Sequence, residues 1–426
     1  MHIFVFILYA VILFLGAQFI NREDWPNLLG FTCTAHFIFF LSFRYLDRLN
    51  LKTLILFAVF YRVILIGIEP KLSDDFYRFL WDGYLVYEGY NPFFWNPVEW
   101  LSQNGNPSEE MVYLFSRMNS PHYYSVYPSV LQSLFFLPWA FEITSLFWQT
   151  FFLQSCLFLF ELINIFLTYK IKPTLAHSSY WVYWGNPLVI WEGISQIHPE
   201  PIIVTLLLVC ILLYRLRRFS GISFVFPFLL QVKMNLIFLL PGIFFSIPKK
   251  YRISLLVFLI FSLVVLAFTV FGEYGAQSSQ GIGLFLHSFR FHSLFESPIY
   301  YFLRIFDRLE YLSGTISLIT GGCVYLYLVS RYKLDLSASF FFGYLCLLLF
   351  SPVIHPWYSL PLIALALERT NTLPWIRAFS FFCGLSYLFY GVKFESFGLI
   401  FLFLESIVYL WIIYGKQSFN YLRQKT

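Results

Sequence analysis

Charged residues are concentrated in one stretch of this chain, SDDFYRFLWDGYLVYEGYNPF (residues 73–93), which lies between long apolar runs. Asp74 and Asp75 are adjacent, and two neighbouring carboxylates repel each other when both are ionised, which raises the pKa of one of them. A carboxylate with a raised pKa suits a general base that deprotonates a hydroxyl group. A solvated acidic turn is the alternative interpretation. The WDG and GYNPF segments that follow at fixed distances favour the base.

Arg78 and Asp82 extend one face of this stretch if it is helical, because residues four apart are neighbours on a helix. Arg78 can then hold the Asp74 carboxylate in place or contact the phosphate of a substrate. Asp82 lies one turn further on. We therefore expect Asp82 to orient Arg78 rather than to take part in the chemistry.

Lys233 is the single charged residue of the apolar segment LLQVKMNLIFLLP, residues 229–241. An ammonium group at membrane depth costs at least a few kcal/mol unless it is paired or solvated, so such a residue is functional by default. We predict that Lys233 contacts a lipid phosphate. A lysine that extends its side chain to the nearer membrane surface is the alternative.

Two further motifs place histidine beside proline. In GISQIHPEP, His198 and Glu200 lie at the rim of two apolar segments, where they could bind a metal, orient a sugar or bridge a phosphate. A capping or interfacial role is the alternative. In SPVIHPWYSLP, His355 and Tyr358 are candidates for the phosphate site and Trp357 for a supporting role, although Trp and Tyr are also enriched at membrane interfaces.

The elements that must position these residues are transmembrane helices. Of the 426 residues, 59% are hydrophobic and 12% are charged, against about 25% charged in soluble domains. Residues 253–271 carry no charge over a length that approaches the roughly 20 residues needed to cross a bilayer. The six cysteines stand singly in apolar segments, which indicates packing rather than a disulfide framework or a zinc site.

We predict an all-α, polytopic transmembrane protein with about 11–14 spans. A single domain, 1–426, would comprise N-terminal spans (1–70), an outer loop with juxtamembrane helices (71–145), and the remaining spans (146–426) with a second outer loop near 272–310. The first apolar run reads as a retained span, and 222–247 could be a re-entrant pair. The apolar runs lie near 3–20, 28–43, 53–69, 146–169, 180–196, 201–214, 222–233, 234–247, 252–271, 311–330, 336–351, 356–368, 374–392 and 397–414.

The basic segments predict the orientation in the membrane. RYLDRLNLK, YKIK, YRLRR, PKKYR, SRYK and KQSFNYLRQK are expected on the cytoplasmic side, where Lys and Arg are enriched. The alternation requires 127–144 to be a helix along the interface rather than a span. All the candidate motifs, and His287 of the second outer loop, then face the outer side. The small, dispersed net charge of +5 does not favour nucleic acid as a partner.

Outer-face carboxylates, a cation at membrane depth and access to lipid together favour glycosyl transfer from a polyprenyl-phosphate sugar. The phosphate leaving group needs no protonation, so one carboxylate activates the acceptor hydroxyl while Lys or Arg stabilises the charge on the phosphate. A glycosidase, in contrast, needs an acid for its alkoxide leaving group. A nucleotide-sugar donor fits less well, because the chain has no P-loop or GxGxxG motif.

The order of the motifs resembles that in bacterial integral-membrane glycosyltransferases of superfamily C. The nearest are polyprenol-phosphate-mannose-dependent mannosyltransferases, with a distant similarity to glycosylphosphatidylinositol mannosyltransferase I. The resemblance covers residues 73–361 and depends on SDDFYRFLWDGYLVYEGYNPF, VYPSVLQSLFF, WGNPLVIWEGISQIHPE, QVKMNLIFLLP and SPVIHPWYSLP.

This resemblance implies a base in the first large outer loop and a polyprenyl-phosphate hexose as donor, with mannose favoured. It places Asp74 at the leading acidic position, so Asp74 is the first candidate for the base. Asp75 is the second, and could instead orient Asp74 or a metal. Eukaryotic relatives carry Asp-x-Asp there, so the adjacent pair leaves open which residue is the base and whether a divalent metal is bound. The expected acceptor is a glycan, glycolipid or protein at the outer, periplasmic face of a bacterial inner membrane.

Two other functions are compatible with the same lipid chemistry. A transporter or flippase of lipid-linked sugars would move the donor intact, but transporters tend to place their sites near the bilayer midplane between internal repeats, and no repeat is visible here. A polysaccharide polymerase would also be rich in aromatic residues. Release of polyprenyl phosphate distinguishes a transferase from a transporter.

Overall fold

The computed structural model describes residues 2–104, 107–271, 289–306, 309–391 and 394–423. This part of the chain is all-α, as the sequence predicts, with one isolated β-bridge between Phe291 and Val353. Short 3₁₀ and π segments include η2 (Trp191–Ser195), η3 (Met234–Leu239), η4 (Ala267–Phe271) and η6 (Pro356–Ser359). The α-helices are α1 (His2–Phe19), α2 (Trp25–Ser42), α3 (Leu51–Val63), α4 (Asp75–Tyr87), α5 (Pro97–Gln103), α6 (Glu109–Arg117), α7 (Ser129–Ala140), α8 (Leu146–Ile171), α9 (His177–Trp184), α10 (Pro187–Ile190), α11 (Glu200–Arg215), α12 (Phe219–Leu230), α13 (Leu240–Ser246), α14 (Lys249–Leu266), α16 (Glu296–Leu303), α17 (Ser313–Tyr332), α18 (Leu336–Leu349), α19 (Leu360–Leu365), α20 (Leu373–Leu385), α21 (Leu388–Gly391) and α22 (Phe394–Arg423).

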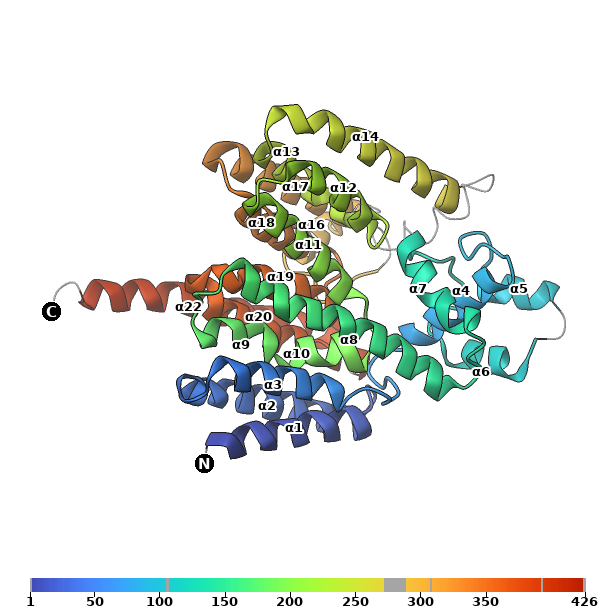
Figure 1. The fold of residues 1–426 in the computed structure, drawn as a ribbon, viewed down its shortest axis with the longest axis horizontal. Coiled ribbons are helices and arrows are strands. Elements are labelled where there is room, and N and C mark those ends of the chain that lie inside the picture. The colour runs from blue at the N-terminus through green and yellow to red at the C-terminus, as the bar shows by residue number, and fades with distance from the viewer. Residues whose placement is uncertain (1, 105–106, 272–288, 307–308, 392–393, 424–426) are drawn as a thin grey trace.

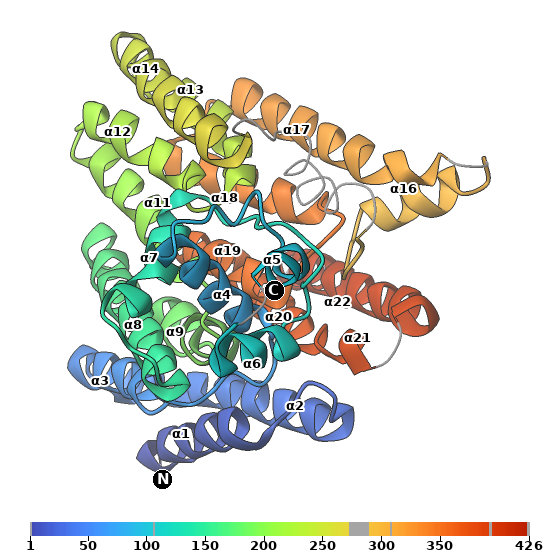
Figure 2. The same ribbon diagram turned by 90° about the vertical axis from the view of Figure 1, so that its right-hand side faces the viewer.

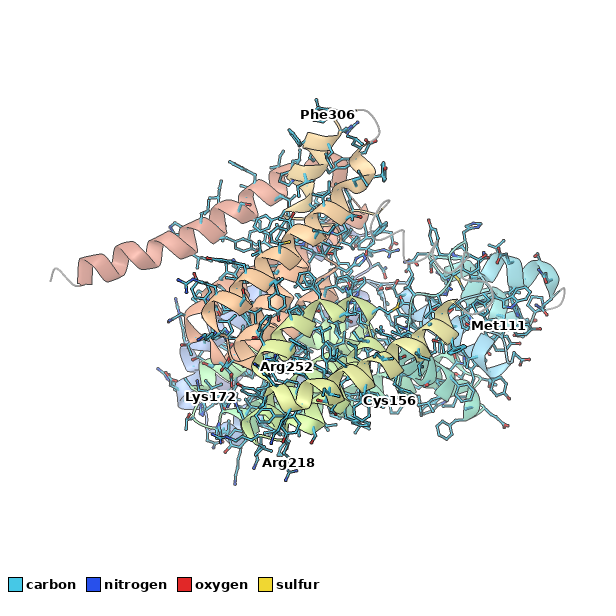
Figure 3. The ribbon with its side chains drawn as sticks, turned by 90° about the horizontal axis from the view of Figure 1, so that it is seen from above. Met111, Cys156, Lys172, Arg218, Arg252 and Phe306 are labelled. Atoms are coloured by element: carbon cyan, nitrogen blue, oxygen red, sulfur yellow. The ribbon has the colours of Figure 1, made fainter. Side chains whose placement is uncertain are left out.

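Most of the helices pack into one bundle, with α1, α2 and α3 along one edge and α12, α13 and α14 along the opposite edge (Figure 1). Helices α4 to α7 form a group at one end of the bundle, which we call the outer unit (residues 75–140). When the bundle is viewed from that end, the outer unit lies in front of its middle (Figure 2). Met111 of the outer unit and the basic residue Lys172 lie toward opposite ends of the molecule (Figure 3).

Four of the described helical segments are long and apolar enough to cross a membrane: Trp25–Arg48, Leu146–Ile171, Lys249–Val270 and Glu310–Tyr332. A fifth is obtained if α10 with η2 and α11, which are bent by 113° at a short break, count as one broken span. These helices indicate an integral membrane protein. Further apolar helical stretches in the described residues have 10–17 residues each, so the larger number of about 11–14 spans stays a prediction.

Helix α7 occupies the segment for which the sequence predicts a helix that does not cross the membrane. It has 12 residues, Ser129–Ala140, which is fewer than the roughly 20 that a span needs. It packs on α4 in the outer unit, where the rings of Phe79 and Phe135 stack with centroids 4.4 Å apart. The indole N–H of Trp139 donates to the carbonyl of Leu80 at 2.9 Å.

Gly83 permits this close packing of α4 on α7. A Cβ atom at Gly83 would lie 2.0 Å from the carbonyl oxygen of Phe135 and 2.4 Å from its carbonyl carbon. Both atoms belong to the backbone of a helix, so they cannot rotate away as a side chain could. The glycine of the WDG motif therefore has a structural reason, the contact between two helices.

A fully buried ion pair joins the N-terminal helices to the rest of the bundle. The Arg62 guanidinium of α3 donates through Nε to the Glu161 carboxylate of α8 at 2.8 Å, and neither side chain is exposed. Asn164 of α8 donates to Glu161 at 3.1 Å and to the carbonyl of Pro201 at 3.0 Å. Since Pro201 lies in the first turn of α11, the pair also fixes the helix that begins at Glu200.

We predict that Gly83→Ala lowers the free energy of unfolding by about 1–3 kcal/mol, the usual cost of overpacking a tight contact. Gly30→Ala is the matched control, because Gly30 also lies in a helix but has no atom within 4 Å of its added Cβ. The midpoint of thermal unfolding, followed by tryptophan fluorescence in detergent, measures both. Equal midpoints for the two variants would contradict the close approach.

The orientation is testable with single cysteines in a background whose six native cysteines are replaced by alanine. Ser116 of the outer unit and Ser330 near the end of α17 are both exposed. We predict that Ser116→Cys reacts with an impermeant maleimide from outside, and that Ser330→Cys reacts only after permeabilisation. The reverse pattern would overturn the outer placement of the candidate site.

Candidate functional site

The candidate residues come together from four separate segments. These segments are the first turn of α4, the turn between η2 and α11, the turn before η3, and the connection from α18 to η6. They bring together Asp74, Asp75, His198, Glu200, Lys233, His355, Trp357 and Tyr358. The described part of the second outer loop also reaches this cluster, because Phe291 pairs with Val353 and its ring centroid lies 4.9 Å from that of His355. Residues 272–288 of that loop, with His287, are outside the described part of the chain.

Asp74 is held by a residue that the sequence did not single out. Its carboxylate accepts a hydrogen bond from the Arg22 guanidinium at 2.5 Å, across the loop between α1 and α2. Asp74 is the N-cap residue of α4, yet its side chain makes no capping hydrogen bond. The Asp74 side chain therefore forms an ion pair with Arg22 in place of a capping hydrogen bond. Of the two neighbouring carboxylates, Asp74 is the more tightly held.

Asp75 has weaker contacts and a more perturbed carboxyl group. Its Oδ1 accepts from the Asn119 amide at 3.4 Å, and its Oδ2 lies 3.9 Å from His198 Nε2. Burial raises the pKa of Asp75 to about 6; the negative charges of Asp74 and Glu200 act in the same direction, while Asn119 and Arg22 oppose them. A carboxylate with this pKa can accept a proton near neutral pH.

A strained turn places His198 beside Asp75. Ile197 adopts φ 60°, a left-handed conformation that is rare for a β-branched residue. The amide N–H of His198 donates to the carbonyl of Glu192 at 3.0 Å, and His198 Nδ1 lies 2.8 Å from the Glu192 carboxylate. Gln196 of the same turn accepts from the N–H groups of Leu72 and Ser73 at 2.8 and 3.2 Å. One turn thus fixes both the histidine and the segment that leads into Asp74 and Asp75.

Trp357 lies between two imidazole rings. The His198 ring stacks on it at a centroid distance of 3.8 Å, and the His355 ring stacks at 4.4 Å. Trp357 is only 6% exposed. With His198 and His355 stacked on it, Trp357 is suited to supporting the two histidines rather than to stacking on a sugar.

Lys233, which follows the end of α12, has two partners. Its ammonium group lies 2.8 Å from the Glu200 carboxylate and 3.3 Å from the centroid of the Tyr358 ring. Glu200 is nearly fully buried, whereas 22% of the Lys233 side chain is exposed. An ammonium has three N–H donors, so one ion pair leaves donors for a second anion.

Arg78 and Asp82 form an ion pair within α4, and Arg78 also holds a neighbouring segment of the outer unit. Arg78 Nε donates to Asp82 at 2.6 Å, which is the orienting contact expected from their spacing. Arg78 Nη1 donates to the carbonyls of Ser120 and Tyr123 at 2.9 and 2.7 Å. These bonds anchor the segment that carries Asn119. Arg22, rather than Arg78, is the arginine that pairs with Asp74.

Across the residues that the structure describes, no group of three or more His, Cys, Asp or Glu side chains is arranged to hold a metal ion. Asp75 and His198 approach each other, but Glu192, the next carboxylate, lies on the other ring nitrogen of His198. A divalent metal between Asp74 and Asp75 would also have to compete with Arg22.

Several contact residues were not singled out from the sequence, among them Arg22, Glu192 and Gln196. The alternation of basic loops does place the NREDWP loop on the outer side, so this signal could have nominated Arg22. Nothing in the sequence pairs it with Asp74. Glu192 and Gln196 lie in and just after a π segment, whose widened turn no simple helical periodicity predicts.

No family model, no curated protein and no solved structure matches this chain. The comparisons therefore show no family. The resemblance stated from the motifs stays a resemblance, and the function rests on the arrangement of the residues.

The Lys233–Glu200 pair predicts a stability effect. Lys233→Met leaves the Glu200 carboxylate buried without its partner, so we expect a loss of about 1–3 kcal/mol in the free energy of unfolding. Lys233→Met combined with Glu200→Gln removes both charges and should recover most of that loss. Thermal midpoints of the two variants measure it, and equal midpoints would show that the ion pair is absent in the membrane-embedded protein.

Proposed function

We propose that this protein is a glycosyltransferase that moves a hexose from a polyprenyl-phosphate sugar to an acceptor hydroxyl at the outer membrane face. The observation that carries the proposal is the juxtaposition of Asp75, whose burial raises its pKa to about 6, with the Lys233–Glu200 ion pair. Glu200 is close enough to Asp75 to raise that pKa further. A proton acceptor and a phosphate-binding cation therefore lie in one cluster.

In the proposed reaction, the Asp75 carboxylate takes the proton of the acceptor hydroxyl. The acceptor oxygen forms a bond to the anomeric carbon of the hexose. The bond between that carbon and the phosphate oxygen breaks, and polyprenyl phosphate leaves with the electron pair. No acid is needed, because a phosphate is a weak base.

The geometry supports Asp75 rather than Asp74 as the base. Asp74 is the choice that the motif resemblance favours, but its carboxylate is already in an ion pair with Arg22. Asp75 has a single long hydrogen bond from Asn119 and a raised pKa.

Lys233 is the proposed phosphate ligand. Glu200 and the face of Tyr358 hold its ammonium group, and its partial exposure leaves room for a third contact. A charge-assisted hydrogen bond to the leaving phosphate would stabilise the charge that develops there. His355 is the candidate for a second phosphate contact, and Arg78, with Asp82, organises the outer unit instead.

The lipid-linked donor fits a protein with several long apolar helices, and the bacterial inner membrane with an outward-facing site is the proposed location. Mannose is the favoured hexose, and the acceptor is a glycan, a glycolipid or a protein. The donor class and the sugar follow from the motif resemblance, whereas the outward-facing site follows from the distribution of basic loops.

The decisive assay incubates the full-length protein in proteoliposomes with a polyprenyl-phosphate hexose and a panel of acceptors. Release of polyprenyl phosphate, coupled to glycosylation of one acceptor, is the expected result. Transfer of intact donor between leaflets without release would indicate a flippase instead. A polymerase would yield products with many added sugars.

Within this assay, we predict that Asp75→Asn lowers turnover by about 10²–10⁴-fold, the usual contribution of general-base catalysis. Asp74→Asn should be milder. For the native protein, kcat/KM should fall as the pH falls through about 6, because protonation of the free enzyme's Asp75 removes the base.

Matched expression and thermal midpoints are the controls for both variants. A large loss in Asp74→Asn with near-normal turnover in Asp75→Asn would make Asp74 the base. Near-normal turnover in both would remove this loop from the chemistry altogether.

A further inference from the structure

Arg22 connects three parts of the chain around the aspartate pair. Its backbone N–H donates to the carbonyl of Lys71 at 3.2 Å, which fixes the α1–α2 loop beside the segment that precedes α4. Its guanidinium bonds to Asp74 at 2.5 Å and lies over the Tyr390 ring, 4.8 Å from the centroid. The Tyr390 hydroxyl lies 3.2 Å from His355 Nδ1. Only 16% of the Arg22 side chain is exposed.

The two adjacent carboxylates are chemically identical, but they have different hydrogen-bond partners. Asp74 receives a strong, short ion pair, whereas Asp75 receives one hydrogen bond of 3.4 Å from a neutral amide. Two neighbouring carboxylates compete for one proton, so a cation on one of them decides which of the two stays ionised.

We infer that Arg22 is a positioning residue for the proposed base: it holds Asp74 as a fixed, ion-paired carboxylate and leaves Asp75 as the member that exchanges a proton. This inference rests on the proposed function for its catalytic meaning. Its physical content, the division of roles within the pair, is measurable without any substrate.

Several charged groups face Asp75 and affect the pH at which it is expected to titrate. Asp74 and Glu200 raise the pKa of Asp75, and Arg22 lowers it. His198 lies 3.9 Å away with Glu192 behind it, and Lys233 is paired with Glu200. Tyr127, Tyr358, Tyr387 and Tyr390 are the neighbouring phenols, and they remain neutral in the pH range concerned. Among the described residues, Arg22 is the cation bonded to the pair, and the Lys233 ammonium also interacts with Asp75 electrostatically.

The experiment is an infrared pH titration of the full-length protein in lipid nanodiscs. The band of the protonated Asp75 carboxyl group is identified as the band that Asp75→Asn removes. In the native protein it should appear as the pH falls through about 6. In Arg22→Gln, which removes the opposing positive charge, the same band should persist to a pH about one unit higher.

Three further variants separate this role from a structural one. Arg22→Lys keeps the charge and should titrate near the native protein. Asp74→Asn removes a neighbouring negative charge, so its band should appear only at lower pH. Glu23→Gln is the matched control, because Glu23 is 77% exposed and lies 3.7 Å from the same guanidinium; it should leave the titration unchanged.

An Asp75 band that titrates identically in Arg22→Gln, Asp74→Asn and the native protein would overturn the inference. If Arg22→Gln does not fold, the Asp74→Asn variant tests the inference instead. An Asp75 band that titrates there at the same pH as in the native protein would also overturn it. Both outcomes are independent of the donor assay. Failure to release polyprenyl phosphate would instead refute the proposed function and leave the titration result in place.

Discussion

The Arg62–Glu161 ion pair illustrates the constraint on which the rest of the molecule depends. In the apolar interior of the bundle an unpaired charge is costly, so each buried charged group must meet a partner. Both side chains of this pair are fully buried. Asn164 extends the network from Glu161 to the carbonyl of Pro201. The ion pair between α3 and α8 thus helps to fix the position of α11 and of Glu200 in its first turn.

The candidate site obeys the same constraint with one exception. Asp74 has Arg22, and Glu200 has Lys233, in each case across segments that are distant in the sequence. Asp75 has no such ion-pair partner within 3.5 Å in the described residues, and the His198 ring lies 3.9 Å from its carboxylate. A partly buried carboxylate that lacks a close counter-ion has a raised pKa, which is the property that a base requires. The reactivity proposed for Asp75 therefore arises from the pairing of its neighbours.

Residue types identified several residues that the structure brings together, but they did not predict the contacts between them. A lysine in an apolar run, and histidines beside prolines, point to function because burial of such groups needs a reason. This logic nominated Lys233, His198 and His355, and the structure places them in one cluster. The same logic favoured contacts along the chain, such as Arg78 with Asp74, whereas the actual partner, Arg22, lies 52 residues away.

Composition and charge pattern by themselves determined that the chain is all-α, rich in membrane-compatible helices and polar at one end. These properties depend on the solubility of each segment in water or lipid, which local sequence carries. Tertiary structure alone decided the length and bend of each helix, the tight contact at Gly83, and the different contacts of Asp74 and Asp75. The physical reason is that a carboxylate's proton affinity depends on burial and on charges within a few ångströms, and the fold brings those charges from distant segments.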